Sequence, residues 1–304
     1  MPSISIILLN YNTLSYTEQC VKSIINSVGD SDFEIIIVEN NSNDKVKIKY
    51  LEKKFKFVKV IVSLKNLGFA AGNNIGVKNA VGKYIVILNN DTIVFSNFIE
   101  KIKTILGNVD KKTIITGFIE GPDGKFQHSG GKEPKVFREL FRFGFLLIKY
   151  IPTKFYDSHY FIPSNDSKVT ILDWASGCFF AMSKDFYQEL NGFDENMFMY
   201  VEDVEFHKRV RLNGGSIIFT PEIKIKHFGS QSSKNYKEIM LRSQYKNTVY
   251  YFKKHTSKLK ISFFYSFSKT IFLVWFLFFS FLVLLTSKSK IVDKKKLYKT
   301  LLFA

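Results

Sequence analysis

The chain has 304 residues, of which 46% are hydrophobic and 23% charged, and its 44 Lys or Arg against 27 Asp or Glu give a net charge of +17. That composition excludes a disordered tail, and the length fits one large domain or two small ones. Its two cysteines, Cys20 and Cys178, exclude a disulfide scaffold and favour a reducing compartment. The first residues lack the basic region and cleavage site of a secretory signal, so none is expected.

The first hundred residues are predicted to alternate between buried strands and helices. Four apolar runs are too short for helices and suit strands buried on both faces: 3–9, 33–38, 58–62 and 84–88. Helical spacing appears between them, at 15–28 and at about 70–80, with a shorter stretch near Leu51. Ser15 and Glu18 form a capping-box pattern at the first of these helices. This alternation predicts an α/β fold with a parallel, doubly wound sheet.

Three of the predicted strands end in polar clusters. Ligands bind beyond the carboxyl ends of the strands in such sheets, so these clusters are expected to meet at one edge. They are Asn10-Tyr11-Asn12, Glu39-Asn40-Asn41-Ser42 and Asn89-Asn90-Asp91. The sequence therefore predicts a binding site at this edge.

A segment with two glycines precedes the helix expected at about 70–80. Gly68 and Gly72 stand four residues apart between Asn66 and Asn74. Glycines let a backbone approach a phosphate or a sugar closely, and a helix N-terminus favours anions. The segment matches neither the GxGxxG fingerprint nor a P-loop, so a tight turn and a ligand loop both remain open.

Four side chains are candidates for acid–base or metal chemistry. Asp91 could hold a divalent cation on a diphosphate, or it could cap a turn or a helix. Asp203, beside Glu202 in a helix predicted over 201–212, could act as a general base or cap that helix. His227, after a strand, could be a metal ligand or a structural histidine.

The middle of the chain is less regular. Residues 121–168 show no clear period, and an irregular insert beside a rigid sheet often builds a substrate site or a lid. Structure is expected to resume at 169–183, with strand-like pieces at 216–220 and 223–227.

The positive charge gathers at the end of the chain. Residues 234–304 hold fifteen Lys or Arg against two acidic residues, a net of +13, so residues 1–233 carry only about +4. The same region holds an apolar run of 17 residues, Thr270–Thr286, with lysines on both sides and Lys269 at its start. This pattern favours an anionic lipid surface, and the run lies at the lower edge of the roughly 17–25 residues that span a bilayer. A spanning helix, an interfacial helix and a buried core helix remain open.

The net charge alone would also suit a nucleic-acid-binding protein. Such a protein needs a basic face with interleaved aromatic residues on its folded domain. Here residues 1–233 are close to charge balance, and the cations crowd around the apolar run. This interpretation is therefore the weakest of those considered.

Several ordered motifs over roughly residues 3–230 resemble the inverting family 2 glycosyltransferases with the GT-A fold. They are Ser5–Asn12, Val38–Ser42, Asn66–Asn74, Leu88–Asp91, Gly192–Glu195 and Tyr200–Asp203. A narrower similarity, to the bacterial rhamnosyltransferase-like branch, rests on Asp123-Gly124, His128–Gly131 and Asp173-Trp174 with Gly177.

The resemblance implies a nucleotide-sugar donor, a divalent cation (Mg²⁺ or Mn²⁺) and displacement of the nucleotide with inversion. Asp203 matches the catalytic base and Glu202 its acidic neighbour. Asp91 and His227 match metal-binding positions, although Asn89 replaces one acidic ligand of the Asp-x-Asp motif. Glu39 stands where the family has an Asp that contacts the nucleoside.

The other residues assigned by the resemblance bind the donor or the acceptor. The nucleotide-sugar set is Asn10, Tyr11, Asn12, Glu39, Asn41, Asn66, Gly68, Gly72, Asn74, Asn89 and Asn90. Trp174 and Gly177 are assigned to the acceptor.

The resemblance also implies a domain organisation: a GT-A catalytic domain at 1–233, with a mostly parallel or mixed sheet. It divides into a Rossmann-like nucleotide-sugar half at 1–118 and an acceptor half at 119–233. Residues 234–304 form a basic, hydrophobic membrane-association region.

The leading hypothesis is a hexosyltransferase that uses a dTDP-rhamnose-like or UDP-hexose donor. Its acceptor would be a lipid-linked or cell-surface glycan at the cytoplasmic face of the bacterial inner membrane, with polysaccharide as the product. The chain would bind there peripherally or through a single span. Among enzymes, a hexosyl- or galactofuranosyl-type transferase with a UDP-sugar is the runner-up to a rhamnosyltransferase with dTDP-rhamnose. A catalytically weak homologue that only binds a sugar nucleotide is the alternative, because Asn89 replaces an acidic residue.

Overall fold

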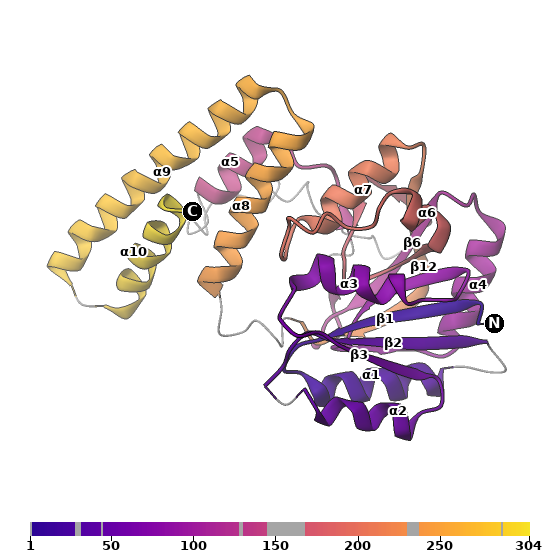
Figure 1. The fold of residues 1–304 in the computed structure, drawn as a ribbon. Helices are drawn as coiled ribbons and strands as arrows, with labels where there is room; N and C mark the ends of the chain where they lie inside the picture. The colour runs from indigo at the N-terminus through magenta and orange to yellow at the C-terminus, as the bar shows by residue number, and fades with distance from the viewer. Residues whose placement is uncertain are drawn as a thin grey trace. The chain divides into compact units, whose positions relative to one another are not determined.

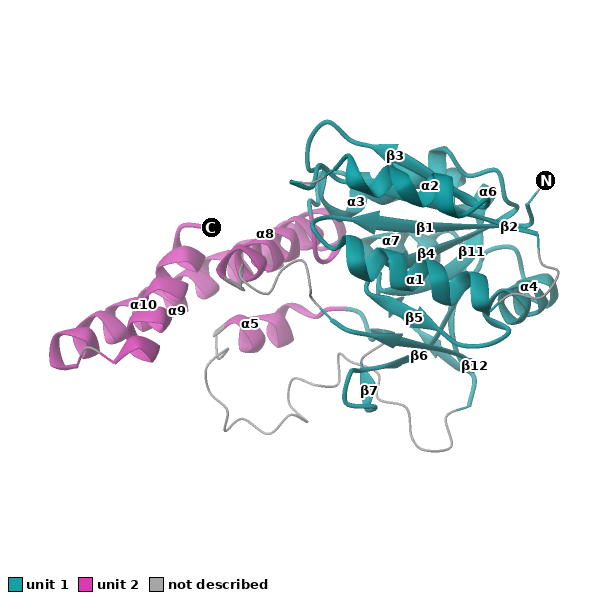
Figure 2. Ribbon diagram, turned by 90° about the horizontal axis from the view of Figure 1, so that it is seen from below, with its two compact units in different colours: residues 1–133, 160–198, 202–232 teal, residues 134–159, 199–201, 233–304 magenta. Residues whose placement is uncertain are grey.

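The computed structural model describes residues 2–27, 32–43, 45–127, 130–144, 168–229, 237–286 and 288–304. Most of the irregular insert, residues 145–167, lies outside this part of the chain, as do His128 and Ser129. The chain forms two compact units (Figure 2). The first comprises Met1–Glu133, Tyr160–Phe198 and Glu202–Ser232, and the second Pro134–His159, Met199–Val201 and Ser233–Ala304.

The first unit is built on a mixed sheet with the strand order β3-β2-β1-β4-β11-β6-β12-β5. Its strands are β1 (Ile4–Asn10), β2 (Phe33–Glu39), β3 (Val58–Val62), β4 (Tyr84–Asn89), β5 (Thr92–Val94), β6 (Thr113–Glu120), β11 (Phe179–Ser183) and β12 (Ser216–His227). Strands β3, β2, β1 and β4 run parallel, whereas β11 pairs antiparallel with β4 and β6. The doubly wound half and the mixed character of the whole sheet confirm the predicted fold class.

Helices cover both faces of this sheet, which explains why its central strands are apolar throughout. They are α1 (Leu14–Asn26), α2 (Tyr50–Lys54) after the 3₁₀ turn η1 (Lys47–Lys49), α3 (Gly68–Lys78), α4 (Phe98–Asn108), α6 (Lys184–Glu189) and α7 (Glu202–Leu212). One core joins alternate residues of β1 to α1 and α4, and the other joins Ile7 of β1 to α3 and α7. Figure 1 shows α1 and α2 on one side of the parallel strands and α3 on the other.

Three local features complete the first unit. The strand pieces expected at 216–220 and 223–227 form one strand, β12, with a register shift between Phe219 and Lys224. The short strands are β7 (Phe126–Gln127), β8 (Gly130–Gly131), β9 (Thr170–Leu172) and β10 (Trp174–Ala175), of which β8 and β10 pair as a separate two-stranded sheet. The predicted capping box is wrong: α1 begins at Leu14, its N-cap Thr13 makes no side-chain cap, and Glu18 pairs with Lys22 and Lys54.

The second unit is helical. It contains α5 (Val136–Gly144), α8 (Lys237–His255), α9 (Lys258–Leu285) and α10 (Ser289–Leu302). It also contains Met199–Val201. Asn247 of α8 binds two carbonyl groups of this segment: its Nδ2 donates to Met199 O at 2.9 Å and to Tyr200 O at 2.8 Å. Tyr200 and Val201 have φ angles of 71° and 72°, a left-handed conformation that a β-branched residue rarely adopts.

Candidate active site

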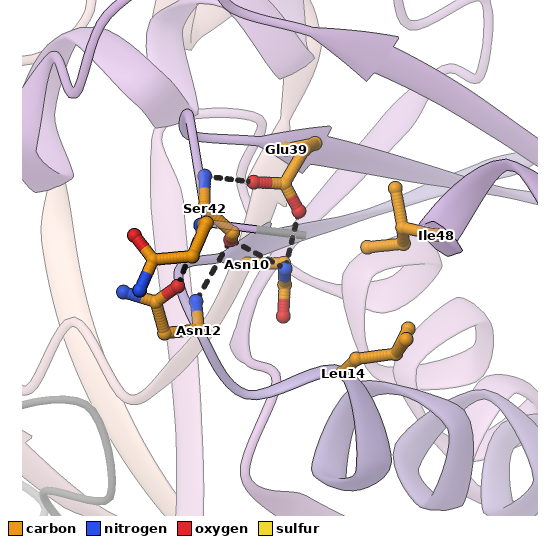
Figure 3. Close-up of a pocket in the computed structure, with 7 residues that line it drawn as sticks. Asn10, Asn12, Leu14, Glu39, Ser42 and Ile48 are labelled. Carbon is orange, nitrogen blue, oxygen red and sulfur yellow. Dashed lines mark hydrogen bonds between the residues drawn. The ribbon is translucent and has the colours of Figure 1, made fainter. Parts of the chain in front are cut away.

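A pocket lies at the carboxyl ends of β1 and β2, where the polar clusters were expected to meet. It has a volume of about 370 Å³ and is lined by Asn10, Asn12, Leu14, Glu39, Ser42, Asn43 and Ile48. Leu14 and Ile48 face the polar side chains across the pocket (Figure 3). A planar ring with polar edges matches this combination of apolar and polar walls.

Glu39 is fully buried at the floor of the pocket, and amide groups hold its carboxylate. Its Oε1 accepts a hydrogen bond from Ser42 N at 2.6 Å, and its Oε2 accepts one from Asn10 Nδ2. Ser42 Oγ in turn accepts a hydrogen bond from Asn12 N at 2.8 Å. A carboxylate has about four acceptor positions, so Glu39 keeps capacity for a donor group of a ligand.

The loops after β1 and β2 adopt special backbone conformations. Asn12 and Asn41 have positive φ angles of 56° and 63°, which asparagine tolerates better than most residues. Asn12 Oδ1 accepts a hydrogen bond from Asn43 N at 2.9 Å, which ties the two loops together. Tyr11, next to Asn12, is partly exposed at this edge.

Asn90, directly after β4, belongs to a buried hydrogen-bond network next to the pocket. Its Nδ2 lies 2.7 Å from the hydroxyls of Thr13 and Thr17, and 3.2 Å from Asn10 Oδ1. Asn90 thus fixes the end of β4 against the end of β1. Thr13 and Thr17 were not singled out from the sequence, because the capping-box pattern at this helix start involves only Ser15 and Glu18.

Asp91 and His227 come together at the next position along the edge. His227 Nε2 lies 3.2 Å from Asp91 Oδ1 and 3.3 Å from Asn89 Nδ2, because β12 pairs with β5 beside them. His227 Nδ1 lies 2.8 Å from Gln127 Oε1, which orients the ring. Burial alone would lower the pKa of the imidazole, but Cys178 and Asp91 outweigh it and raise the pKa to about 11.

These side chains fit a divalent cation as a partial ligand set. A carboxylate and a neutral imidazole are both ligands of Mn²⁺, so a bound cation would displace the proton that the raised pKa keeps on His227. Mg²⁺ on a diphosphate commonly uses one or two carboxylates. Within the described ranges no group of three or more His, Cys, Asp and Glu residues is placed to hold a metal. The protein would therefore supply Asp91 and His227, and the diphosphate and water the remaining ligands.

Asp203 lies in the first turn of α7, and backbone donors hold both of its oxygens. Oδ2 accepts a hydrogen bond from Gly177 N at 3.0 Å, and Oδ1 accepts one from Val204 N at 2.8 Å. Burial raises the pKa of Asp203, and these two hydrogen bonds oppose the rise. A Cβ at Gly177 would come within 2.9 Å of the Phe69 ring, so glycine permits this close approach.

Glu202 is more strongly perturbed than its neighbour. It is buried, its Oε2 has no hydrogen-bond partner among the described residues, and both burial and the charge of Asp203 raise its pKa well above 4.5. Two adjacent carboxyl groups in different environments divide into a proton-bearing one and an ionised one. The environment of Glu202 therefore favours the protonated form more than that of Asp203, whose oxygens accept two backbone hydrogen bonds.

Replacing Glu202 by Gln is expected to change how the stability of the protein depends on pH. A raised pKa means that the folded protein binds the Glu202 proton more tightly than the unfolded chain does. Proton binding at Glu202 therefore stabilises the fold fully below about pH 4.5, and this stabilisation is lost as pH rises through the pKa of the folded state. Gln does not titrate. The difference in melting temperature between Glu202→Gln and wild type should therefore grow in favour of Gln above pH 4.5; a constant difference from pH 4 to 9 would contradict the assignment.

The remaining donor-site candidates have packing or bridging roles in the structure. A Cβ on Gly68 would lie 2.1 Å from Phe198 O, and one on Gly72 would lie 2.4 Å from Leu9 Cδ1, so both glycines allow close packing of α3. Asn66 Oδ1 accepts hydrogen bonds from Gly68 N at 3.0 Å and from Asn40 Nδ2 at 2.9 Å, which form the turn before α3.

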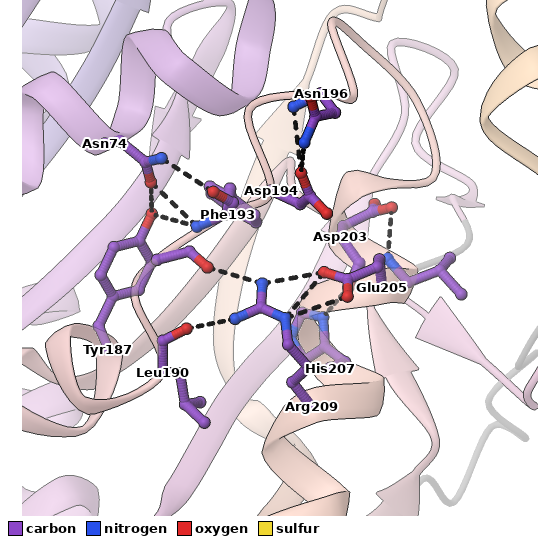
Figure 4. A network of polar contacts seen from close by, with 12 residues as sticks. Asn74, Tyr187, Leu190, Phe193, Asp194, Asn196, Asp203, Glu205, His207 and Arg209 are labelled. Atoms are coloured by element: carbon purple, nitrogen blue, oxygen red, sulfur yellow. Dashed lines mark hydrogen bonds and ion pairs between the residues drawn. The ribbon is translucent and has the colours of Figure 1, made fainter. Parts of the chain in front are cut away.

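Asn74 belongs to a network that the sequence did not indicate as a unit (Figure 4). Its Oδ1 accepts hydrogen bonds from Tyr187 Oη at 2.6 Å and Phe193 N at 3.0 Å. Arg209 pairs with buried Glu205 at 2.9 Å and donates to Gly192 O at 2.7 Å. The i,i+4 spacing of Glu205 and Arg209 is the one sequence signal that points to it.

The two residues assigned to the acceptor have different contacts. Gly177 donates its backbone N–H to Asp203, whereas the indole N–H of Trp174 binds a backbone carbonyl elsewhere. Trp174 is 6% exposed, and its Nε1 donates to Lys132 O at 3.0 Å. It pairs with Gly131 between β10 and β8.

A series of hydrogen bonds links Asp203, the Asp91–His227 pair and the Glu39 pocket along one edge of the sheet. Asp203 binds Gly177 N, and the next residue, Cys178, accepts a hydrogen bond at its carbonyl from Asn89 N at 2.8 Å. Asn89 contacts His227, and its neighbour Asn90 reaches Asn10 beside Glu39. The Glu39 pocket, the Asp91–His227 pair and Asp203 thus follow one another along the sheet edge.

Comparison with known proteins identifies two sequence families. The family model "Glycosyl transferase family 2" matches residues 5–189, which is more than half of the chain. A second model, "N-terminal domain of galactosyltransferase", matches residues 162–231 and so includes Asp203 and His227.

Curated relatives include N-acetylgalactosaminyltransferase 6 of Drosophila melanogaster, which is 26% identical over 82% of this chain and 40% of that protein. An uncharacterised glycosyltransferase of Haemophilus influenzae is 34% identical over 39% of this chain and 37% of its own length. The minor teichoic acid biosynthesis protein GgaB of Bacillus subtilis is 32% identical over 40% of this chain and 14% of its own length. The chain thus spans at most two fifths of the length of these relatives.

Solved structures with the same fold include GalNAc-T7 with UDP, GalNAc and Mn²⁺. Its TM-score is 0.58 at 16% identity, covering 83% of this chain and 50% of that one. Residues 1–349 of S. aureus TarS give a TM-score of 0.54 at 14% identity, covering 83% of this chain and 64% of that one. These identities support the fold alone.

Proposed function

The chain belongs to glycosyl transferase family 2, and we propose that it transfers a sugar from a nucleoside diphosphate sugar to a hydroxyl group of a glycan acceptor, with inversion. One observation carries this proposal. The buried Glu39 pocket, the Asp91–His227 pair and the Asp203 carboxylate are linked along one edge of the sheet, in the order that a nucleoside, a diphosphate and an acceptor hydroxyl require.

The pocket beside Glu39 would take the nucleoside. Its carboxylate can accept a hydrogen bond from a ring N–H or a ribose hydroxyl, and Leu14 and Ile48 supply apolar contact for a base. GalNAc-T7 and TarS, two structural neighbours, were both solved with UDP, which supports a uracil nucleotide. A dTDP-rhamnose-like donor is the runner-up, because thymine presents the same ring N–H.

Replacing Glu39 by Gln is expected to weaken binding of UDP or dTDP by roughly 10- to 100-fold, since hydrogen bonds to a charged group contribute about 1.5–3 kcal/mol each. Titration calorimetry with each nucleotide measures the effect. The matched control is Glu100→Gln, an exposed position on α4. Wild-type affinity in a folded Glu39→Gln protein would place the nucleoside elsewhere.

Asp91 and His227 would hold a divalent cation, with Asn89 beside them. GalNAc-T7, a structural neighbour, was solved with Mn²⁺, which supports this cofactor. When bound, the cation stabilises the negative charge that gathers on the departing diphosphate. A carboxylate and an imidazole with an amide neighbour make a weaker set than two carboxylates, so we expect modest metal affinity in the absence of the nucleotide.

Asp203 would act as the general base. In a single displacement the acceptor oxygen forms its bond to the anomeric carbon, the bond from that carbon to the diphosphate breaks, and the hydroxyl proton passes to Asp203. The two backbone donors hold the carboxylate in one orientation, and the raised pKa of Glu202 disfavours a second negative charge beside it. The reaction requires no nucleophile from the protein.

The acceptor and the location are further parts of this proposal. We assign residues 1–118 to the nucleotide sugar, residues 119–233 with Trp174 and Gly177 to the acceptor, and residues 234–304 to membrane association. We further propose a lipid-linked or cell-surface glycan acceptor at the cytoplasmic face of the membrane, and similarity to a teichoic acid biosynthesis protein supports the cell-surface glycan.

A donor screen tests the proposal. UDP-hexoses, UDP-N-acetylhexosamines and dTDP-rhamnose are incubated with the purified chain and Mn²⁺, and nucleotide release is followed by chromatography. We expect release from one donor class, and transfer with an inverted anomeric configuration by NMR when a glycan acceptor is present. A protein that binds a donor without Mn²⁺-dependent release would instead be a binding homologue, as Asn89 allows.

A further inference from the structure

The apolar helix α9 leaves most of its surface uncovered within the second unit. It is 28 residues long, and it is the one helix among the described residues with the length and apolar character to cross a membrane. Only 17% of its most apolar window is buried. Its exposed side chains include Phe263, Phe267, Leu277, Phe278, Phe281 and Leu284.

Helix α10 folds back along α9 (Figure 1). The Tyr298 ring stacks against Trp275 and Phe279, with ring centroids 5.9 Å from each. Lys269 Nζ donates to Leu301 O at 3.1 Å and to Leu302 O at 2.6 Å, which satisfies two carbonyls at the end of α10. Because the end of α10 meets the middle of α9, the two helices run antiparallel.

The packing of α10 decides between the two membrane placements that the sequence left open. Alongside the apolar stretch of α9, α10 carries Lys294, 5.3 Å over the Phe279 ring, and Lys295, 6.0 Å from the Phe276 ring. A spanning α9 would carry these lysines and Asp293 into the hydrocarbon, where charged side chains are costly. In the interface the lysines instead reach phosphate groups, while their apolar stems cover the helix.

We propose that α9 and α10 form a hairpin that lies in the plane of an anionic membrane surface and does not span it. The proposal rests on the membrane location in the proposed function. The uncovered apolar side of α9 enters the boundary between headgroups and acyl chains, and the α10 lysines bind lipid phosphates. Phe137 of α5, which is 69% exposed and 5.7 Å from the Phe263 ring, extends the apolar surface.

Charge favours lipid over protein as the occupant of this surface. Residues 234–304 carry a net charge of +13. A second copy of the chain on the same surface would bring two such segments together, and like charges repel. An anionic bilayer is complementary both to the cations and to the apolar side chains between them.

Labelling with a membrane-impermeant maleimide distinguishes the two placements. Ser257→Cys lies at the N-cap of α9, and Ser289→Cys lies at the start of α10, a few residues beyond the other end of α9. Both positions are exposed, as is Lys111→Cys, which reports on the first unit. The natural cysteines are both buried, so background labelling is low. In inside-out membrane vesicles that carry the full chain, we expect all three variants to react without detergent.

Two outcomes would overturn the proposal. If Ser257→Cys or Ser289→Cys reacts only after detergent is added, the helix spans the bilayer. If the full chain stays in the soluble fraction, the hairpin does not bind membranes. Neither measurement uses a nucleotide sugar, so a failure of the proposed transfer reaction would leave both results unchanged.

A second measurement tests the lipid chemistry by flotation with vesicles of 30% phosphatidylglycerol in phosphatidylcholine. Replacing Lys290, Lys294 and Lys295 together by Gln should weaken partition by on the order of 100-fold, since each cation near the surface contributes roughly five-fold. The control replaces Lys53, Lys56 and Lys111 of the first unit by Gln and should leave partition within two-fold. Equal loss in both variants, undiminished binding to pure phosphatidylcholine, or a stable dimer without vesicle binding would contradict it.

Discussion

Replacing Asp203 by Asn is expected to lower the rate of sugar transfer by roughly two to four orders of magnitude, the usual contribution of a general base. Asn cannot take the acceptor proton, yet it is nearly the same size and can still accept one of the two backbone hydrogen bonds that hold Asp203. Since Asp203 lies away from the Glu39 pocket along the site, nucleotide affinity should stay within a few-fold of wild type. Steady-state kinetics with the donor found in the screen, and calorimetry with its nucleotide, measure the two quantities.

Asp185→Asn is the matched control for this substitution. Asp185 also lies in the first turn of a helix, α6, but is exposed to solvent, so its replacement should leave turnover unchanged. The pH profile gives an independent readout. Because burial raises the pKa of Asp203, the acid limb of kcat/KM should lie above the ordinary aspartate value of 3.8, with activity lost as the carboxylate is protonated. Near wild-type turnover in Asp203→Asn would show that another group is the base.

The half of the site built on parallel strands could be predicted because its signal is local. Short apolar runs indicated the strands, and the polar residues directly after them had to lie at one edge, because parallel strands share a carboxyl end. Asn10, Asn12 and Glu39 do line one pocket, together with Ser42 from the same cluster. The family assignment is confirmed, since the family 2 model covers residues 5–189.

Contacts between distant segments could not be predicted from the local pattern of the sequence, and only the family resemblance assigned Asp91 and His227 to the same metal site. Asp91 and His227 meet because β12 pairs antiparallel with β5, a pairing that no periodicity in either segment indicates. Gly177 contacts Asp203 through its backbone N–H, so its side-chain chemistry gives no signal. The capping box failed for a related reason: Glu18 turns to Lys54, which is distant in sequence, and not back to its own helix start.

The tail shows the same limit. Composition identified an apolar run with cations on both sides, but it could not distinguish a spanning helix from an interfacial one. The structure adds a contact that composition could not indicate: Lys269 donates to the carbonyls of Leu301 and Leu302, more than thirty residues away, and so helps to hold α10 along α9. The ammonium group of Lys269, at the start of the apolar run, thus has hydrogen-bond acceptors at the end of α10.

Replacing Asp91 by Asn is expected to abolish the response of transfer to Mn²⁺ or Mg²⁺ and to reduce the rate by roughly 100- to 1000-fold, since charge stabilisation by a metal contributes several kcal/mol. Asp91 is the one carboxylate of the Asp91–His227 pair, and an amide oxygen binds a divalent cation much less strongly than a carboxylate. Electron paramagnetic resonance of Mn²⁺ with the protein and UDP measures metal binding without relying on activity.

Asn89→Asp provides the opposite test at the same site. It places a second carboxylate beside the Asp91–His227 pair, where Asn89 Nδ2 now lies 3.3 Å from His227 Nε2. If a cation binds between these side chains, the added charge should lower the Mn²⁺ concentration for half-maximal activity by about ten-fold, as expected when a ligand gains a full charge. The two variants should therefore shift metal affinity in opposite directions. Parallel shifts, or none in Asp91→Asn, would place the cation elsewhere or show that transfer proceeds without one.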